Sequence, residues 1–418
     1  MKLNRIKLEN FRGFNELNMN CGGKSVVLLG KNGAGKTTIL DGIALMLSRI
    51  VKKITNIGNE VRIDDTDVMY KKIRSHISIE MDFHDRELHW GCTKKKRDTP
   101  KWTGADDLQH ITDYLNTVID DNYEHDGMKG MPICIYYPVH RIVNDIPLRI
   151  RKKHDFSIQD TAFERAMTGG ADFRTFFEWY RNREDLENEK KIQTGLEYID
   201  LQLNSVRTAI YDFLPNFKNL RISRSPLRML IEKEGITLEV NQLSDGEKCL
   251  LALVGDLARR LAIANPGLDN PLLGEGIVMI DEVELHLHPK WQRKVISGLT
   301  RVFRNIQFII TTHSPQVIGE ADHMKLFVLE YSQRGNKVHV AESVFGQDVN
   351  YVTEEIMEVP IRNEEVQSLI EELYRVIEDC DWPSVDRIRS LLKSKVNYNE
   401  VPELLRADMI INRRRDID

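Results

Sequence analysis

The residues with the clearest chemical potential form a glycine-rich segment, GKNGAGKT at 30–37, which matches the pattern G-x-x-x-x-G-K-[ST]. An apolar run at 25–29 precedes it, and apolar residues at helical spacing follow it. Glycines let the backbone curl so that N–H groups point at phosphate oxygens, and the following helix adds a partial positive charge. We predict a phosphate-binding loop in which Lys36 reaches the β- and γ-phosphates and the Thr37 hydroxyl binds Mg²⁺. The loop residues expected to contact the nucleotide are Asn32, Gly33, Ala34, Gly35, Lys36, Thr37 and Thr38.

Two carboxylates end a second apolar run, since residues 277–282 read IVMIDE. Phosphate-loop enzymes need an aspartate at such a strand end, opposite the loop, to hold Mg²⁺, and Asp281 has that place. Glu282 is then suited to orient or deprotonate the attacking water. Because many strands end in acidic residues, this pattern alone is weak evidence, and it indicates a Mg²⁺ site only together with the phosphate loop. Together the two segments predict a catalytic site for ATP and Mg²⁺.

Strands and helices alternate around these residues, which predicts an α/β fold with a mixed sheet that contains parallel strands. We expect two strands and a turn in the first 30 residues and one strand at 76–92. A helical insert follows, and a helical tail begins near 350, with an amphipathic helix from Asn363. The other expected elements are strands at 133–139, 276–280, 307–312 and a pair within 324–342, and helices at about 156–214, from 245, and at 289–304.

Composition narrows the class of protein. With 418 residues, 41% of them hydrophobic and 29% charged, the chain has enough apolar material for a large core and is not a disordered sequence. No run of about 18 apolar residues occurs, so we expect no membrane span and no membrane partner. The five cysteines are scattered without a CxxC, which argues against a disulfide framework or zinc ribbon and favours the cytoplasm. The net charge of −5 restricts any nucleic-acid binding to local basic patches.

The motif set resembles the ABC-type ATPase head of the RecF, Rad50, SMC and OLD kind, over about 1–135 and 225–345. This resemblance implies a P-loop ABC-type fold that binds ATP and Mg²⁺. The motifs that carry it, in the family's order, are ENFRGF at 9–14, the phosphate loop, LSDGEK at 243–248, IDEVELHLHP at 280–289 and FIITTHSP at 308–315.

LSDGEK is similar to the ABC signature, and its residues suit an anion site. Ser244 and Gly246 lie at the start of a predicted helix, where a hydroxyl, a backbone N–H and the helix dipole all favour a negative ligand. Without the other motifs, Ser244 would be read as a simple helix cap. In the family, the signature of one protomer closes on the γ-phosphate held by another, so the resemblance implies a head-to-tail homodimer or a higher homo-oligomer.

Other site residues follow from the resemblance alone. It makes His313 the sensor of the γ-phosphate, with a catalytic role beside Glu282, and it places Arg12 near the nucleotide. His286 and His288 fall in the family's D-loop, so we expect no metal site there. The family's glutamine loop is not placed, and its candidates are Gln109 and Gln159.

The branch of the family is argued from the insert and the tail. The insert is too short for SMC arms and lacks the CxxC of a zinc hook, and only 105 residues follow His313, which argues against an added nuclease domain. Asp379-Cys380-Asp381 is interpreted as a solvated helix end. The chain looks most like the ATPase subunits (PtuA) of Septu-type anti-phage systems, also found with some retrons. That likeness rests on YYPVHR at 136–141, on 169–189, on 281–292 and on the tail after 345–357, and it implies a small PtuB-like HNH nuclease as partner.

The alternative is a RecF-like, ATP-gated DNA-binding protein of repair or replication, and direct DNA binding stays open. Basic runs occur at 94–97, 149–153 and 413–415, and the usual reading of such runs is a solvated surface. The apolar stripe of the tail is expected either to pack on the head or to dock a partner. The predicted domains are the two head halves at 1–144 and 226–345, the helical insert at 145–225, and the helical tail at 346–418.

Overall fold

The computed structural model describes residues 1–55, 62–83, 86–96, 112–113, 116, 130–139, 159–169, 173–195, 197–331, 336–341, 344–357, 360 and 362–415. The chain divides into two compact units, Met1–Gln347 and Asp348–Asp418. The basic run at 149–153 and Gln109 lie outside the described residues. All other predicted site residues lie within the first unit.

One sheet of the first unit is antiparallel, with the strand order β2-β1-β4-β5. Its strands are β1 (Lys2–Phe11), β2 (Phe14–Asn20), β4 (Arg74–Phe83) and β5 (Arg86–Lys95). The expectation of two strands before residue 30 is wrong, because the chain reverses at Arg12 and Gly13 and makes a third strand. The single strand expected at 76–92 is also wrong: it is a hairpin, whose first strand alternates cleanly in burial while the second is largely half-buried.

The other main sheet holds the predicted parallel strands, in the order β13-β12-β3-β11-β10-β6. Five strands are parallel, and β13 is an antiparallel edge. Carboxyl ends of parallel strands meet at one edge of a sheet, so the segments after β3, β10 and β11 become neighbours. The α/β prediction is confirmed. The strands are β3 (Val26–Gly30), β6 (Ile133–Tyr137), β10 (Gly276–Ile280), β11 (Ile306–Thr312), β12 (Lys325–Glu330) and β13 (Lys337–Ala341).

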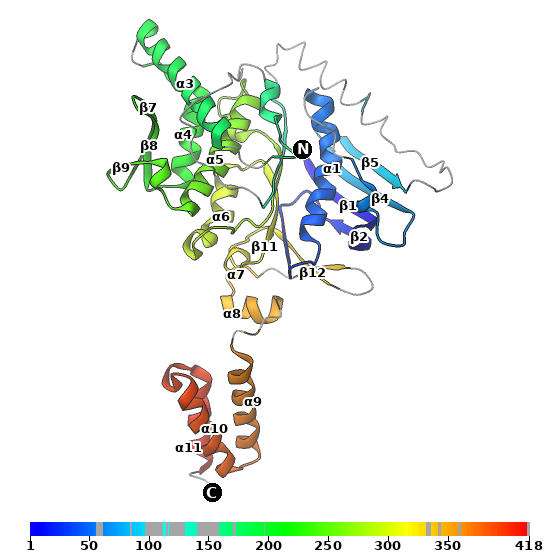
Figure 1. The fold of residues 1–418 in the computed structure, drawn as a ribbon, viewed down its shortest axis with the longest axis vertical. Coiled ribbons are helices and arrows are strands. Elements are labelled where there is room, and N and C mark those ends of the chain that lie inside the picture. The colour runs from blue at the N-terminus through cyan, green and yellow to red at the C-terminus, as the bar shows by residue number, and fades with distance from the viewer. Residues whose placement is uncertain are drawn as a thin grey trace. The chain divides into compact units, whose positions relative to one another are not determined.

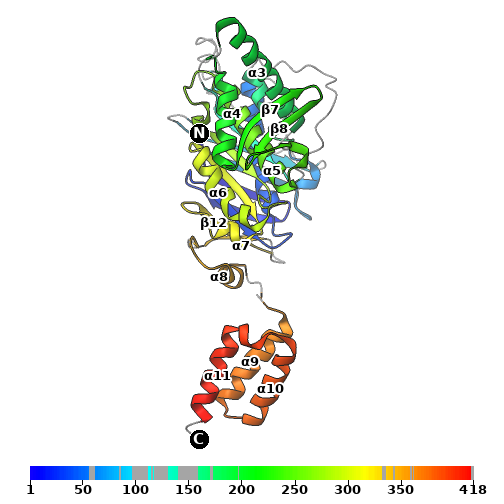
Figure 2. The same ribbon diagram turned by 90° about the vertical axis from the view of Figure 1, so that its left-hand side faces the viewer.

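Helices cover both faces of this parallel sheet. The helix α1 (Lys36–Thr55) lies on one face, between the two sheets, whereas α4 (Leu201–Phe213), α5 (Asp245–Ala264) and α6 (Pro289–Val302) lie on the opposite face (Figures 1 and 2). Gln307 joins the two sheets: its Oε1 accepts from Leu3 N at 2.6 Å, and its Nε2 donates to Leu3 O at 3.0 Å. Helix α1 itself contacts β4 of the antiparallel sheet and β3, β6 and β11 of the parallel sheet.

The insert is helical, as expected, but it also adds a small sheet. It contains the 3₁₀ helix η2 (Gln159–Phe163) and α3 (Phe173–Thr194), and it leads into α4. The aromatic side chains of α3 are buried, so they pack the helix. The strand β7 was missed because a register shift between Lys218 and Arg221 breaks its alternation. It pairs with β8 across the predicted boundary at 225, and the sheet consists of β7 (Phe217–Arg224), β8 (Leu227–Lys233) and β9 (Ile236–Glu239).

The second unit has a hydrophobic core of its own. After the short α8 (Val349–Tyr351), the helices α9 (Glu364–Glu378), α10 (Trp382–Lys395) and α11 (Pro402–Arg415) pack together (Figure 2). The apolar stripe of α9 faces α10 and α11, so the expectation that it packs on the head is wrong, and docking of a partner by the tail stays a prediction. Asp379 and Asp381 cap the ends of α9 and α10, as predicted. The core residues are Ile370, Leu373, Ile377, Val385, Ile388, Leu392, Tyr398, Leu404, Ala407 and Ile411.

Candidate functional site

The glycine-rich loop forms a tight turn between β3 and α1. Ala34 N donates to Lys31 O at 3.1 Å, and the helix begins at Lys36. Gly33 and Gly35 have φ angles of +82° and +96°, which L-residues with side chains rarely adopt. A Cβ at Gly35 would also lie 2.7 Å from the Phe14 ring. The glycines of the motif are therefore required by the backbone itself, and Asn32 and Gly33 are exposed at the tip.

The Lys36 ammonium is held over this turn by backbone carbonyls. Its Nζ donates to Gly30 O at 2.8 Å and to Lys31 O at 3.3 Å. Burial lowers the pKa of Lys36 to about 8, although Asp281, Glu282 and Glu284 favour the charged form. A buried cation whose partners are mostly neutral oxygens gains from an anionic ligand, since a phosphate would compensate for its lost hydration.

The two predicted Mg²⁺ ligands are in direct contact. Thr37 Oγ1 donates to Asp281 Oδ2 at 2.8 Å, although the residues are 244 positions apart. The other carboxylate oxygen, Oδ1, accepts from Thr311 Oγ1 at 2.5 Å. A hydroxyl and a carboxylate are the hard oxygen donors that Mg²⁺ prefers, so the donor set fits the ion.

Glu282 follows Asp281 in a strained backbone conformation. Its φ angle is +47°, in the left-handed region that such a residue seldom adopts, and such strain is common at functional sites. Its backbone N–H donates to Thr311 Oγ1 at 2.7 Å. The Thr311 hydroxyl therefore bonds both acidic residues. Thr311, in the FIITTHSP motif, is not among the predicted site residues, and the signal that could have found it is its position beside Asp281 on the neighbouring parallel strand.

His313 lies in the same charged cluster. Its backbone N–H donates to Glu284 Oε1 at 2.5 Å, and Glu284 Oε2 is buried with no hydrogen-bond partner in the described part of the chain. Burial lowers the pKa of His313, as does the Lys36 cation, while the carboxylates of Glu284, Glu282 and Asp281 act in the opposite direction. Glu284 is a residue that the sequence analysis missed, and it positions the segment that carries His313.

Arg12 lies beside the start of α1. Its guanidinium pairs with Asp41 of α1, and its Nε donates to Asp67 Oδ1 at 2.8 Å. Tyr136 OH also donates to Asp41, at 3.0 Å. Arg12 is thus paired with two carboxylates, and contact with a nucleotide would require it to exchange one of them. Thr38, in the first turn of α1, is half-buried.

Ser244 and Gly246 are placed differently from the other predicted residues. Ser244 is the N-cap of α5, and its hydroxyl donates to Glu247 Oε2 at 2.9 Å. A Cβ at Gly246 would lie 2.8 Å from His286 O, so the signature packs against the segment after β10. Because α5 and α1 cover opposite faces of the sheet (Figure 1), the signature and the phosphate loop start different helices on different sides. Their contact across a dimer stays a prediction.

The remaining polar candidates have structural partners. His288 is the N-cap of α6, and its Nδ1 accepts from Lys290 N at 3.3 Å. Among the described residues, no group of three or more His, Cys, Asp or Glu side chains is arranged to hold a metal ion. Gln159 Nε2 donates to Ala264 O at 2.5 Å, at the end of α5. The glutamine loop therefore stays unplaced.

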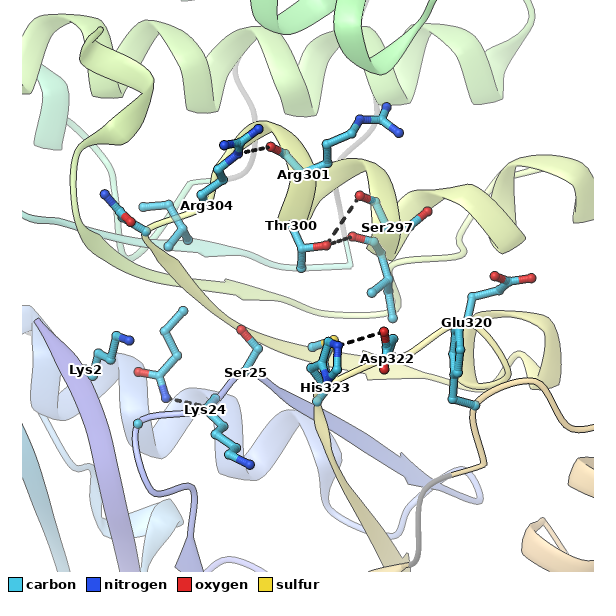
Figure 3. A pocket seen from close by; sticks show the side chains of 17 residues that line it. Lys2, Lys24, Ser25, Ser297, Thr300, Arg301, Arg304, Glu320, Asp322 and His323 are labelled. Atoms are coloured by element: carbon cyan, nitrogen blue, oxygen red, sulfur yellow. Dashed lines mark hydrogen bonds and ion pairs between the residues drawn. The ribbon is translucent and has the colours of Figure 1, made fainter.

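A pocket of about 710 Å³ lies at the other edge of the parallel sheet, where strands β3, β11 and β12 begin (Figure 3). Lys2, Lys24 and Arg304 line it together with Glu320 and an Asp322–His323 pair, so its charges are mixed. No predicted site residue is among its lining, and it does not extend the candidate site. In the part of the chain that the structure describes, no helix combines the length and apolar character needed to cross a bilayer.

Comparison with known proteins finds ATPases among those to which the chain is similar. An AAA domain model matches residues 5–217, and a second AAA domain model, described for the AbiEii toxin of a type IV toxin–antitoxin system, matches residues 149–319. The Retron Ec83 probable ATPase of Escherichia coli is 32% identical over 85% of this chain and 76% of its own length. The Retron Vc95 probable ATPase of Vibrio cholerae serotype O1 biovar El Tor is 29% identical over 91% of this chain and 85% of that protein.

More distant similarities were also found. The Septu protein PtuA of Bacillus thuringiensis is 23% identical over 78% of this chain and 75% of its own length. Among solved structures, the SMC head domain from Thermotoga maritima has a TM-score of 0.45 and 14% identity. The matched region covers 82% of this chain and 100% of the SMC head chain.

Proposed function

The chain belongs to the family of ABC-type AAA-domain ATPases that includes the Retron Ec83 probable ATPase, and from this premise we propose that it is the ATP-driven switch of an anti-phage defence system. The observation that carries the chemistry is the contact of Thr37 with Asp281 at the carboxyl edge of the sheet. It joins the phosphate loop to the acidic strand end with oxygen donors turned toward each other. The proposed place of action is the cytoplasm, since the substrate is ATP and the cysteines are unpaired thiols.

Each residue of the cluster has a definable task. Lys36 exchanges its carbonyl partners for phosphate oxygens, and the loop N–H groups hold the remaining phosphate charge. Thr37 and Asp281 would hold Mg²⁺, which when bound neutralises charge on the phosphate oxygens. Glu282 accepts a proton from the attacking water, and Thr311 fixes the backbone that presents it. His313, on whose pKa the Lys36 charge acts, senses a change at the terminal phosphate.

We infer that the complete site is shared between two copies of the chain. The support is the placement of Ser244, whose helix begins on the opposite face of the sheet from α1. Glu247 holds the Ser244 hydroxyl, and Lys233 neutralises Glu247 at 2.7 Å, so the signature turn is rigid before any ligand arrives. A rigid hydroxyl and helix N-terminus can close on the phosphate held by another protomer.

Mixing two inactive variants tests this arrangement. Lys36→Ala removes the phosphate loop's cation, and Ser244→Arg blocks the signature, so each variant alone should be inactive. In a head-to-tail dimer, half of the randomly mixed dimers regain one intact site, so a 1:1 mixture should show about a quarter of wild-type ATP hydrolysis. A mixture that stays inactive, with both variants folded by circular dichroism, would refute the shared site.

The proposed partner is a small HNH nuclease of the PtuB kind, which the nucleotide state of this chain restrains or arms. The support is the likeness to the Septu protein PtuA and to the two retron ATPases. Co-expression with an HNH nuclease from the same operon, followed by plasmid cleavage assays with ATP, with ADP and without nucleotide, tests the proposal. Nuclease activity that is independent of nucleotide and of Lys36→Ala would refute it. Salt-dependent duplex binding by the isolated chain, with no such nuclease in the operon, would favour a RecF-like role.

A further inference from the structure

Asn336 lies next to the phosphate loop, although it is 302 residues away from Ala34 in the sequence. It precedes β13 and is buried, with 8% of its surface exposed. Its backbone N–H donates to Gly13 O at 3.2 Å, and its side-chain Nδ2 donates to Ala34 O at 2.8 Å. Asn336 thus ties the turn between β1 and β2 to the phosphate loop.

The bond to Ala34 determines the direction of a neighbouring N–H group. In a planar trans peptide, the carbonyl oxygen of one residue and the N–H of the next point in opposite directions. The Ala34 carbonyl and the Gly35 N–H belong to one peptide. Holding the carbonyl toward Asn336 therefore turns the Gly35 N–H away from Asn336, toward the inside of the loop. Gly35 N–H has no hydrogen-bond partner among the residues that the structure describes.

The surroundings leave the amide little freedom. A Cβ at Gly35 would lie 3.0 Å from Asn336 Nδ2, and a Cβ at Gly13 would lie 3.1 Å from the same atom. Two glycines thus make the space that this side chain occupies. The Phe14 ring packs against the same side of Gly35, 2.7 Å from the position of that Cβ. The peptide between Ala34 and Gly35 is therefore fixed in orientation before a ligand binds.

We propose that Asn336 is a positioning residue for phosphate binding: its amide holds the Ala34 carbonyl outward so that the Gly35 N–H faces the nucleotide's diphosphate. The proposal rests on the function proposed above and adds a residue outside the phosphate-loop motif. Asn336 touches neither phosphate nor metal in this role. Its effect is to orient a donor in advance, which lowers the free energy that binding would otherwise spend on ordering the peptide.

Two variants distinguish the loss of the amide donor from the introduction of a negative charge. Asn336→Asp keeps the shape but cannot donate, and Asn336→Leu removes the donor without adding charge. Both should weaken binding of ATP, ADP and inorganic pyrophosphate about tenfold by calorimetry. In each case the Gly35 N–H is no longer oriented before the ligand binds. The kcat at saturating ATP should change less than twofold. The matched control is Asn305→Asp, which removes an exposed bond between the same two chemical groups, from Asn305 Nδ2 to Leu273 O at 2.6 Å, far from the phosphate loop.

The outcomes distinguish this proposal from the proposed function. If Lys36→Ala loses ATP binding while both Asn336 variants bind pyrophosphate within twofold of wild type, the positioning role is refuted and the phosphate loop stands. If only Asn336→Asp weakens binding, the effect is charge repulsion and the positioning role is again refuted. If Lys36→Ala still binds ATP, the proposed function itself fails. Asn336→Asp preserves side-chain volume, so where Asn336→Leu does not fold, pyrophosphate binding by Asn336→Asp within twofold of wild type still refutes the positioning role.

Discussion

Replacing Lys36 by methionine should stabilise the nucleotide-free protein while abolishing ATP binding. Methionine is similar in length to lysine and needs no hydration, whereas the buried ammonium has exchanged water for Gly30 O and Lys31 O. ATP binding should be lost because Lys36 is the buried cation over the loop carbonyls, whereas the other lysine of the loop, Lys31, is exposed. Both effects have one cause, the buried ammonium of Lys36. It binds phosphate when nucleotide is present, and it destabilises the folded protein when the site is empty.

The magnitude follows from the pKa of Lys36, which burial lowers from 10.5 to about 8. At about 1.4 kcal/mol per pKa unit, the charged form loses at most about 3.5 kcal/mol on folding. The open side of the loop admits water, and methionine forfeits the two hydrogen bonds, so a net gain of about 1–2 kcal/mol in unfolding free energy is expected at pH 7.

The gain should depend on pH with a defined sign. Below pH 8 the lysine is charged in both states, and the folded wild type bears the full penalty. Between pH 8 and 10.5 the folded state releases its proton while the unfolded state retains it, so wild-type stability rises with pH. The advantage of Lys36→Met should therefore shrink across this window. Groups that titrate in the same way in the wild type and in Lys36→Met do not affect the difference between their unfolding free energies.

Urea unfolding at pH 7, 8, 9 and 10, without nucleotide, measures this difference. Lys31→Met is the matched control, because it removes an exposed lysine from the same loop. A Lys36→Met protein that is less stable than wild type at pH 7, or whose advantage grows toward pH 10, would show that the ammonium is not the unfavourable group. Calorimetry on the same samples checks the loss of ATP binding.

Three further outcomes are expected. Glu282→Gln should bind ATP and Mg²⁺ but stall hydrolysis, so that an ATP-bound dimer accumulates in light scattering; near-normal phosphate release would remove Glu282 from the role of base. Thr311→Val should raise the Mg²⁺ concentration for half-maximal hydrolysis several-fold, because Asp281 loses its hydroxyl donor; an unchanged Mg²⁺ dependence would contradict the role given to that hydroxyl. Truncation after Gln347 should leave a folded unit that binds ATP, since the tail has its own core, and an insoluble product would show that the first unit depends on it.

The sequence alone determined the phosphate loop, because its requirements are local. Gly33 and Gly35 permit the positive φ angles that the turn adopts, and Lys36 and Thr37 follow within one helical turn. The alternation of apolar runs and helical periodicity also predicted the parallel sheet, and with it the meeting of Asp281 and the loop at one edge.

Only the tertiary structure decided which side chains support that site. Thr311, Glu284 and Asn336 act through hydrogen bonds to residues at least 29 positions away, and such pairs leave no spacing to recognise. The β7 strand escaped prediction because a register shift disturbs its two-residue period.

In the tail, too, the sequence predicted a helix, whereas the tertiary structure decided what covers it. Its apolar stripe predicted a helix with one face to bury, but a stripe carries no information about what covers it. The structure covers it with α10 and α11, which bring Val385, Ile388 and Leu404 onto Ile370 and Leu373. Periodicity is a property of one element, whereas burial is a property of the elements that meet. For that reason the sequence determined the helices of this unit, and only their packing decided that they form a core of their own.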